Sequence, residues 1–81
     1  MIAKEAADYW HGAAEARALT GREGVEVIAS AIERIEAAAL HAAPPVAMRA
    51  MDTLEYLSAS GPTAVVREAA VDALRWIRAP R

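Results

Sequence analysis

The sequence predicts an all-α domain, and three observations support this prediction. Apolar residues recur at alternating steps of three and four, the spacing that places them on one face of an α-helix. Alanine, the residue with the highest helix propensity, occurs 22 times. No stretch has the apolar–polar alternation of a half-buried strand. We therefore predict one four-helix, bundle-like domain over residues 1–81, with helices at about 2–19, 21–42, 45–58 and 63–78.

The stretch 20–42 has the strongest pattern, and we expect the other helices to pack around it. Its apolar residues form one seam, which consists of Val25, Ile28, Ile32, Ile35, Ala39 and Ala42. The seam is about six turns long, whereas the third predicted helix could cover only about four. The excess near Val25 and Ile28 must then be covered by the first helix, by a second copy of the chain or by a partner.

The helix ends are marked by residues with specific backbone preferences. Thr20 and Glu23 have the spacing of a capping box, which predicts that the second helix begins there. Pro44 and Pro45 would end that helix, because proline has no N–H and clashes with the preceding turn. Pro45 also suits the first turn of the third helix, and Thr63 can cap the fourth.

The other three helices have weaker apolar faces. The first offers Ile2, Tyr9 or Trp10, and Leu19; the third offers Ala47, Ala50, Met51, Leu54 and Leu57; the fourth offers Val66, Ala69 or Ala70, Ala73, Leu74 and Ile77. Because about half of the apolar residues are alanine, the buried area only narrowly offsets the conformational entropy lost on folding. We therefore expect the protein to work as a homodimer or in a stable complex with another protein.

The overall composition argues against several functions. A net charge of −2 is unfavourable for a generic binder of nucleic acid or of anionic membranes. No run reaches the roughly 18 apolar residues of a membrane span, and the N-terminus lacks the apolar core of a secretory signal. We therefore expect a cytoplasmic protein. The absence of cysteine excludes disulfides and thiolate metal sites.

Few residues have the spacing that catalysis or metal binding requires. Asp8, His11 and Glu15 can share one face of the first helix, but they do not match the motifs of zinc or di-metal centres. We interpret them as a solvated polar face. The chain has no cysteine nucleophile, no glycine-rich phosphate loop and no suggestion of a Ser–His–Asp arrangement. We therefore predict a protein that is not an enzyme and that needs no cofactor.

Aromatic rings at the edges of the predicted apolar faces are the best candidates for contact with a partner, since such rings are enriched at interfaces. The candidate partner-binding residues are Tyr9, Trp10, Val25, Tyr56, Arg75, Trp76 and Arg78. Residues 51–57, MDTLEYL, are similar to residues 71–77, VDALRWI, and Trp76 occupies the position that matches Tyr56. Trp76 is also expected to pack between helices. These residues predict an interaction module, namely a small helical adaptor, inhibitor or regulatory subunit.

DNA binding is the alternative. Residues 52–70, DTLEYLSASGPTAVVREAA, resemble the opening helices of winged-helix regulators, in which a recognition helix and a wing follow. The resemblance implies a small transcriptional regulator or antitoxin-like protein that uses the helix-turn-helix-like region 52–81, whose C-terminal tail is locally basic. Here, however, the helix after the turn runs on to Ile77, where a recognition helix would be expected. Residues 66–74, VREAAVDAL, resemble the second helix of a HEAT-type repeat, which we interpret as a shared packing solution.

Overall fold

The computed structural model describes residues 20–80, and these form three α-helices that each pack against the other two. The helices are α3 (Val25–His41), α4 (Pro44–Ser60) and α5 (Ala64–Arg78). Within this range no residue belongs to a strand, so the all-α prediction is confirmed for it. The predicted four-helix bundle is not supported, since three helices are seen and the predicted first helix, 2–19, lies outside the described residues.

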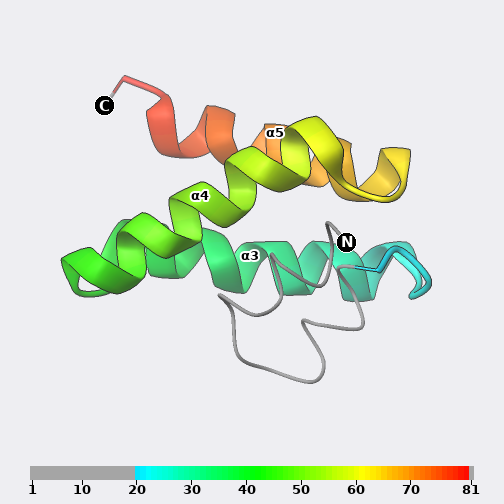
Figure 1. The fold of residues 1–81 in the computed structure, drawn as a ribbon, viewed down its shortest axis with the longest axis horizontal. Coiled ribbons are helices and arrows are strands. Elements are labelled where there is room, and N and C mark those ends of the chain that lie inside the picture. The colour runs from blue at the N-terminus through cyan, green and yellow to red at the C-terminus, as the bar shows by residue number, and fades with distance from the viewer. Residues whose placement is uncertain (1–19, 81) are drawn as a thin grey trace.

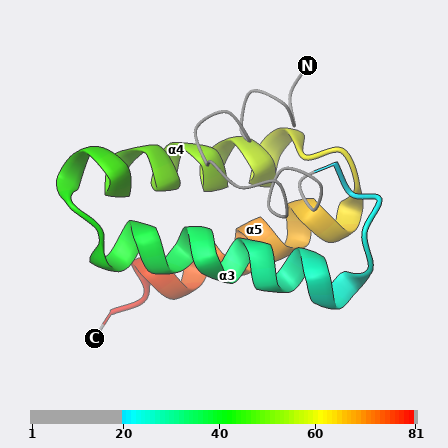
Figure 2. The ribbon, with the colours of Figure 1, turned by 90° about the horizontal axis from the view of Figure 1, so that it is seen from below.

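The three helices form one small bundle (Figures 1 and 2). α3 and α4 lie side by side and run in opposite directions, and only Ala42 and Ala43 separate them in the chain. α4 then crosses obliquely to α5, which runs back in the same direction as α3. The starts of α3 and α5 therefore lie at one end of the bundle, and their ends lie at the other.

The core is formed by one face of each helix. It contains Ile28, Ala31, Ile32 and Ile35 of α3, Ala50, Leu54 and Leu57 of α4, and Val66, Ala70, Ala73 and Leu74 of α5. The predicted faces are confirmed at most of these positions. Thr53 is an unpredicted member of the interior and is only 1% exposed. Its hydroxyl donates to the carbonyl oxygen of Arg49 at 2.8 Å, so the buried polar group is satisfied within its own helix.

The predicted start of the second helix is wrong, because α3 begins at Val25. Gly21 has a φ of +78°, a left-handed conformation that an α-helix does not contain. Gly24 is the N-cap and makes no side-chain capping bond. The hydroxyl of Thr20 accepts instead from the backbone N–H of Arg22 at 3.4 Å, so the capping box does not form. The chain turns over 20–24 before it becomes helical.

Because α3 is shorter than predicted, its apolar seam no longer extends beyond the helix that covers it. α3 and α4 have 17 residues each, so one can cover the other along its length. Ile28 is buried at 2% exposure, whereas Val25, which was expected to lie in the seam, is 65% exposed. Val25 is the first residue of the helix and precedes the first core residue by nearly a full turn. It therefore lies beyond the packed layer.

The predicted end of α3 and the predicted starts of α4 and α5 are confirmed to within about one residue, whereas α4 runs on to Ser60, beyond its predicted end at about 58. α3 ends at His41, before the two prolines, and Pro44 and Pro45 occupy the first turn of α4. The hydroxyl of Thr63 accepts from the backbone N–H of Val66 at 3.3 Å and so caps α5. These ends depend on local backbone chemistry alone, which is why the sequence predicts them well.

Candidate protein-interaction site

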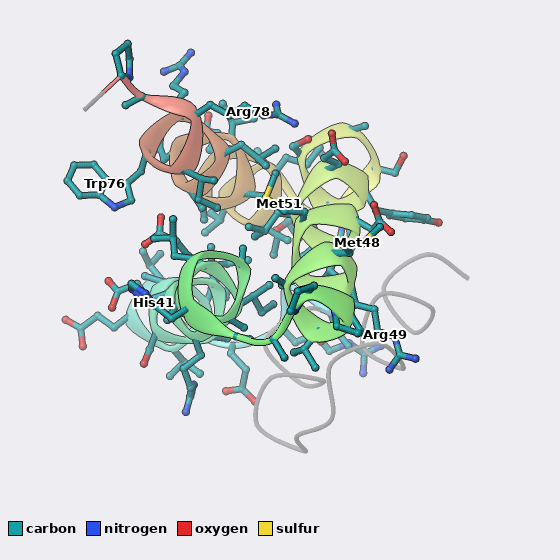
Figure 3. The ribbon with its side chains drawn as sticks, turned by 90° about the vertical axis from the view of Figure 1, so that its left-hand side faces the viewer. His41, Met48, Arg49, Met51, Trp76 and Arg78 are labelled. Carbon is teal, nitrogen blue, oxygen red and sulfur yellow. The ribbon has the colours of Figure 1, made fainter. Side chains whose placement is uncertain are left out.

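Six large apolar side chains remain exposed among the residues that the structure describes: Val25, Val27, Val46, Met48, Val65 and Trp76. Five of them lie within the first five residues of a helix, and only Trp76 lies near the C-terminal end of one. Trp76 is 61% exposed, so the expectation that it packs between helices is wrong. Figure 3 shows it projecting from α5 on the side away from α4. Most of the indole surface is therefore in contact with solvent.

A groove of about 310 Å³ runs between α3 and α5. It is lined by Ala29, Ile32, Glu33 and Glu36 of α3 and by Ala69, Asp72 and Ala73 of α5. On each helix these positions are three or four residues apart, so they share one face. Trp76 is the next position on the same face of α5, four residues after Asp72 and three after Ala73. Trp76 therefore follows the groove-lining residues of α5 on the same face, toward the end of the helix, without lining the groove itself.

The groove has an apolar floor and acidic walls. The floor is shallow because three of its four apolar residues are alanine and the fourth, Ile32, is almost fully buried. Glu33 and Glu36 stand on the α3 wall and Asp72 on the α5 wall, and no basic side chain lines the groove. Asp72 approaches Arg75 at 3.9 Å, but both side chains are largely exposed, so this pair screens the charge of Asp72 only weakly.

The arginines of α5 lie mainly on its other side, toward α4. The Arg78 guanidinium donates to the Glu55 carboxylate at 2.7 Å, which links α5 to α4. The Arg67 guanidinium donates to the carbonyl oxygen of Gly61 at 2.8 Å, at the end of α4. Arg75 and Arg78 line a second hollow, to which Val71 and Leu74 also belong. The predicted partner-binding arginines and Trp76 therefore do not form one cluster.

The remaining candidates are dispersed or lie outside the described residues. Tyr56 belongs to α4, is partly buried and does not line the α3–α5 groove. Val25 lies at the opposite end of the bundle from Trp76, since α3 and α5 run in the same direction. Tyr9 and Trp10 precede the described part of the chain. Among the predicted residues that the structure describes, Trp76 is exposed next to the α3–α5 groove in the helical order of α5, and Val25, Tyr56, Arg75 and Arg78 do not line that groove.

Neither a metal centre nor a membrane span is found in the described part of the chain. Over residues 20–80, no group of three histidine, aspartate or glutamate side chains is placed to hold a metal ion. The triplet considered from sequence, Asp8, His11 and Glu15, lies outside this range. None of the three helices combines the length and the apolar character that crossing a bilayer requires.

Comparisons of the chain with protein-family models, with curated proteins and with solved structures give no match. The resemblances to winged-helix regulators and to HEAT-type repeats therefore rest on the residues quoted for them.

The acidic walls of the groove are the feature that sequence reasoning missed. When α3 is considered alone, Glu33 and Glu36 are expected to belong to a solvent-exposed polar face. Their spacing with Ala29 and Ile32 shows that all four share a face, but it does not show which helix lies beside that face. Only the approach of α5 brings Asp72 opposite them.

Proposed function

We propose that the chain is a non-enzymatic protein–protein interaction module, a small helical adaptor, inhibitor or regulatory subunit that binds another protein or a second copy of itself. The observation that supports this function best is the exposure of Trp76 beside an apolar groove. The proposal places the protein in the cytoplasm, without a cofactor.

The energetics of the described core favour such a role. Four of the eleven buried apolar residues are alanine, so the hydrophobic contribution of this core is modest for a domain of this size. Tryptophan is among the residues that contribute most to protein interfaces. Covering roughly 100 Å² of the Trp76 indole would contribute about 2.5 kcal/mol to binding. An interface would therefore add substantially to a small stability margin.

Sedimentation equilibrium of the full chain over a wide concentration range tests the proposal. We expect a mass above that of the monomer, or a protein partner retained from cell extract, and we expect Trp76→Ser to weaken either association. Ala59→Ser, on an exposed position of α4, is the control and should have no effect. A chain that stays monomeric at high concentration and retains no partner would contradict the proposal.

DNA binding remains the second candidate, because Arg67, Arg75 and Arg78 lie along α5. It has less support, since the guanidinium groups of Arg67 and Arg78 already donate to the Gly61 carbonyl oxygen and to the Glu55 carboxylate. Contacts to phosphate would have to displace these partners. Retention of the protein on duplex DNA across a salt series separates the two functions, because binding through phosphates weakens steeply as salt rises.

A further inference from the structure

We propose that the groove between α3 and α5 binds a basic amphipathic helix of a partner protein, with Trp76 as its apolar anchor. This inference rests on the proposed function and deepens it by naming the chemistry of the partner. The shape of the groove, the charge of its two walls and the position of the indole all favour such a partner.

The shape of the groove suits a helix better than a small molecule. It is bounded by two helices that run in the same direction and is open to solvent, so a small ligand would leave much of its surface in water. An amphipathic helix that lies along such a groove buries only its apolar face and keeps its polar face wet. The alanines of the floor allow a close approach of the incoming side chains, and Trp76 adds a large apolar surface beside them.

The charge of the walls specifies the flanks of that helix. Glu33 and Glu36 stand on one wall and Asp72 on the other, so an apolar stripe seated between them is bordered by carboxylates on both sides. Lysine or arginine on both flanks of the stripe would pair with these carboxylates. Acidic flanks would be repelled. Complementarity of this kind determines which partner binds and how fast, while the apolar contacts provide much of the affinity.

The described part of a second copy is a poorer occupant. The apolar face of each of its three helices is already buried in its own core. Arg67 and Arg78 are engaged with oxygen atoms of their own chain, at the end of α4 and on Glu55. A separate partner helix fits both the charge and the apolar floor better.

A synthetic peptide of leucine and lysine, about 14 residues or roughly four turns long, tests the inference. Its leucines lie on one helical face and its lysines on both flanks, and calorimetric titration into the full chain measures its affinity. Two control peptides have glutamate in place of lysine, or the same composition with the leucines spread around the helix. We expect only the first peptide to bind well, and we expect its binding to weaken as salt rises.

Variants of the protein locate the binding site. The double variant Glu33→Arg/Asp72→Arg and the single variant Trp76→Ala should each lose at least tenfold in affinity for the lysine peptide. Asp52→Arg, an exposed charge reversal on α4, is the matched control and should change the affinity less than twofold. Because all four positions are exposed, each variant should keep the helical circular dichroism of the wild type.

Three results would overturn the inference. In the first, Asp52→Arg lowers the affinity for the lysine peptide as much as Glu33→Arg/Asp72→Arg does. In the second, the peptide with its leucines spread around the helix binds as tightly as the amphipathic one. In the third, the lysine peptide does not bind to the wild type. If the wild type does not bind the lysine peptide but still associates in sedimentation equilibrium, the groove is not the binding site and the proposed interaction function stands.

Discussion

Thr53 and Met48 lie on the same helix and reverse the usual distribution of polar and apolar side chains. Thr53 is buried, with its hydroxyl bonded one turn back along α4, whereas Met48 is 67% exposed. The rotation of the helix explains both, since the buried positions of α4 are Ala50, Thr53, Leu54 and Leu57 and residue 48 is not on that face. The position of a residue around its helix, more than its polarity, determines its burial here.

Leu54→Ala and Met48→Ala remove apolar side chains from these two environments. We expect Leu54→Ala to lower the free energy of unfolding by about 2–5 kcal/mol, because Leu54 is fully buried and a cavity would remain. Met48→Ala should stay within about 0.5 kcal/mol of the wild type. Urea denaturation followed by circular dichroism measures both. Similar losses for the two variants would show that the face of α4 is assigned incorrectly.

A glycine stands at the start of α3 and another directly after the end of α4, and the two positions differ in the room they have for a side chain. Gly24, the N-cap of α3, has extended backbone dihedrals, and no atom lies within 4 Å of a Cβ added there. Gly61 follows α4 and is buried, and an added Cβ would lie 2.7 Å from the carbonyl oxygen of Leu57. One glycine is therefore replaceable, and the other is required by close packing.

The same substitution at both glycines should have opposite effects. Gly24→Ser supplies a capping hydroxyl and reduces the freedom of the unfolded chain, so we expect a stability gain of about 0.5–1 kcal/mol. Gly61→Ser should lower stability by about 1–3 kcal/mol, because the backbone would have to move. Thermal denaturation of the two variants beside the wild type is the measurement. A loss at Gly24 would mean that its open surroundings are wrongly described.

Helix ends show how much of the fold the sequence could predict. The stop before Pro44 and the cap at Thr63 depend on a proline ring and a hydroxyl, so they can be inferred without a fold. The start of α3 could not, because Thr20 and Glu23 fit a capping box equally well whether or not the chain turns at Gly21. Local propensities decide an end only where no competing turn is available.

At the scale of the whole molecule, the all-α class and most of the core follow from helical spacing. The groove does not, because it depends on the pairing of α3 with α5, which are separated in sequence by all of α4. Periodicity shows that Ala73 faces inward but not which helix it faces. The exposure of Trp76 could not be predicted either, because helical spacing does not show where the neighbouring helices stop covering α5.

The order of the helices has a consequence for the rate of folding. α3 and α4, like α4 and α5, are joined by short links, whereas contact of α3 with α5 closes a loop that contains all of α4. Closing that longer loop costs more entropy, so we expect the two helical hairpins to form first and the α3–α5 contact to form last. Ile32→Val, on the groove floor, should then mainly accelerate unfolding, whereas Leu57→Ala, within α4, should slow folding. Stopped-flow kinetics separates the two rates, and a folding rate slowed by Ile32→Val as much as by Leu57→Ala would reverse this order.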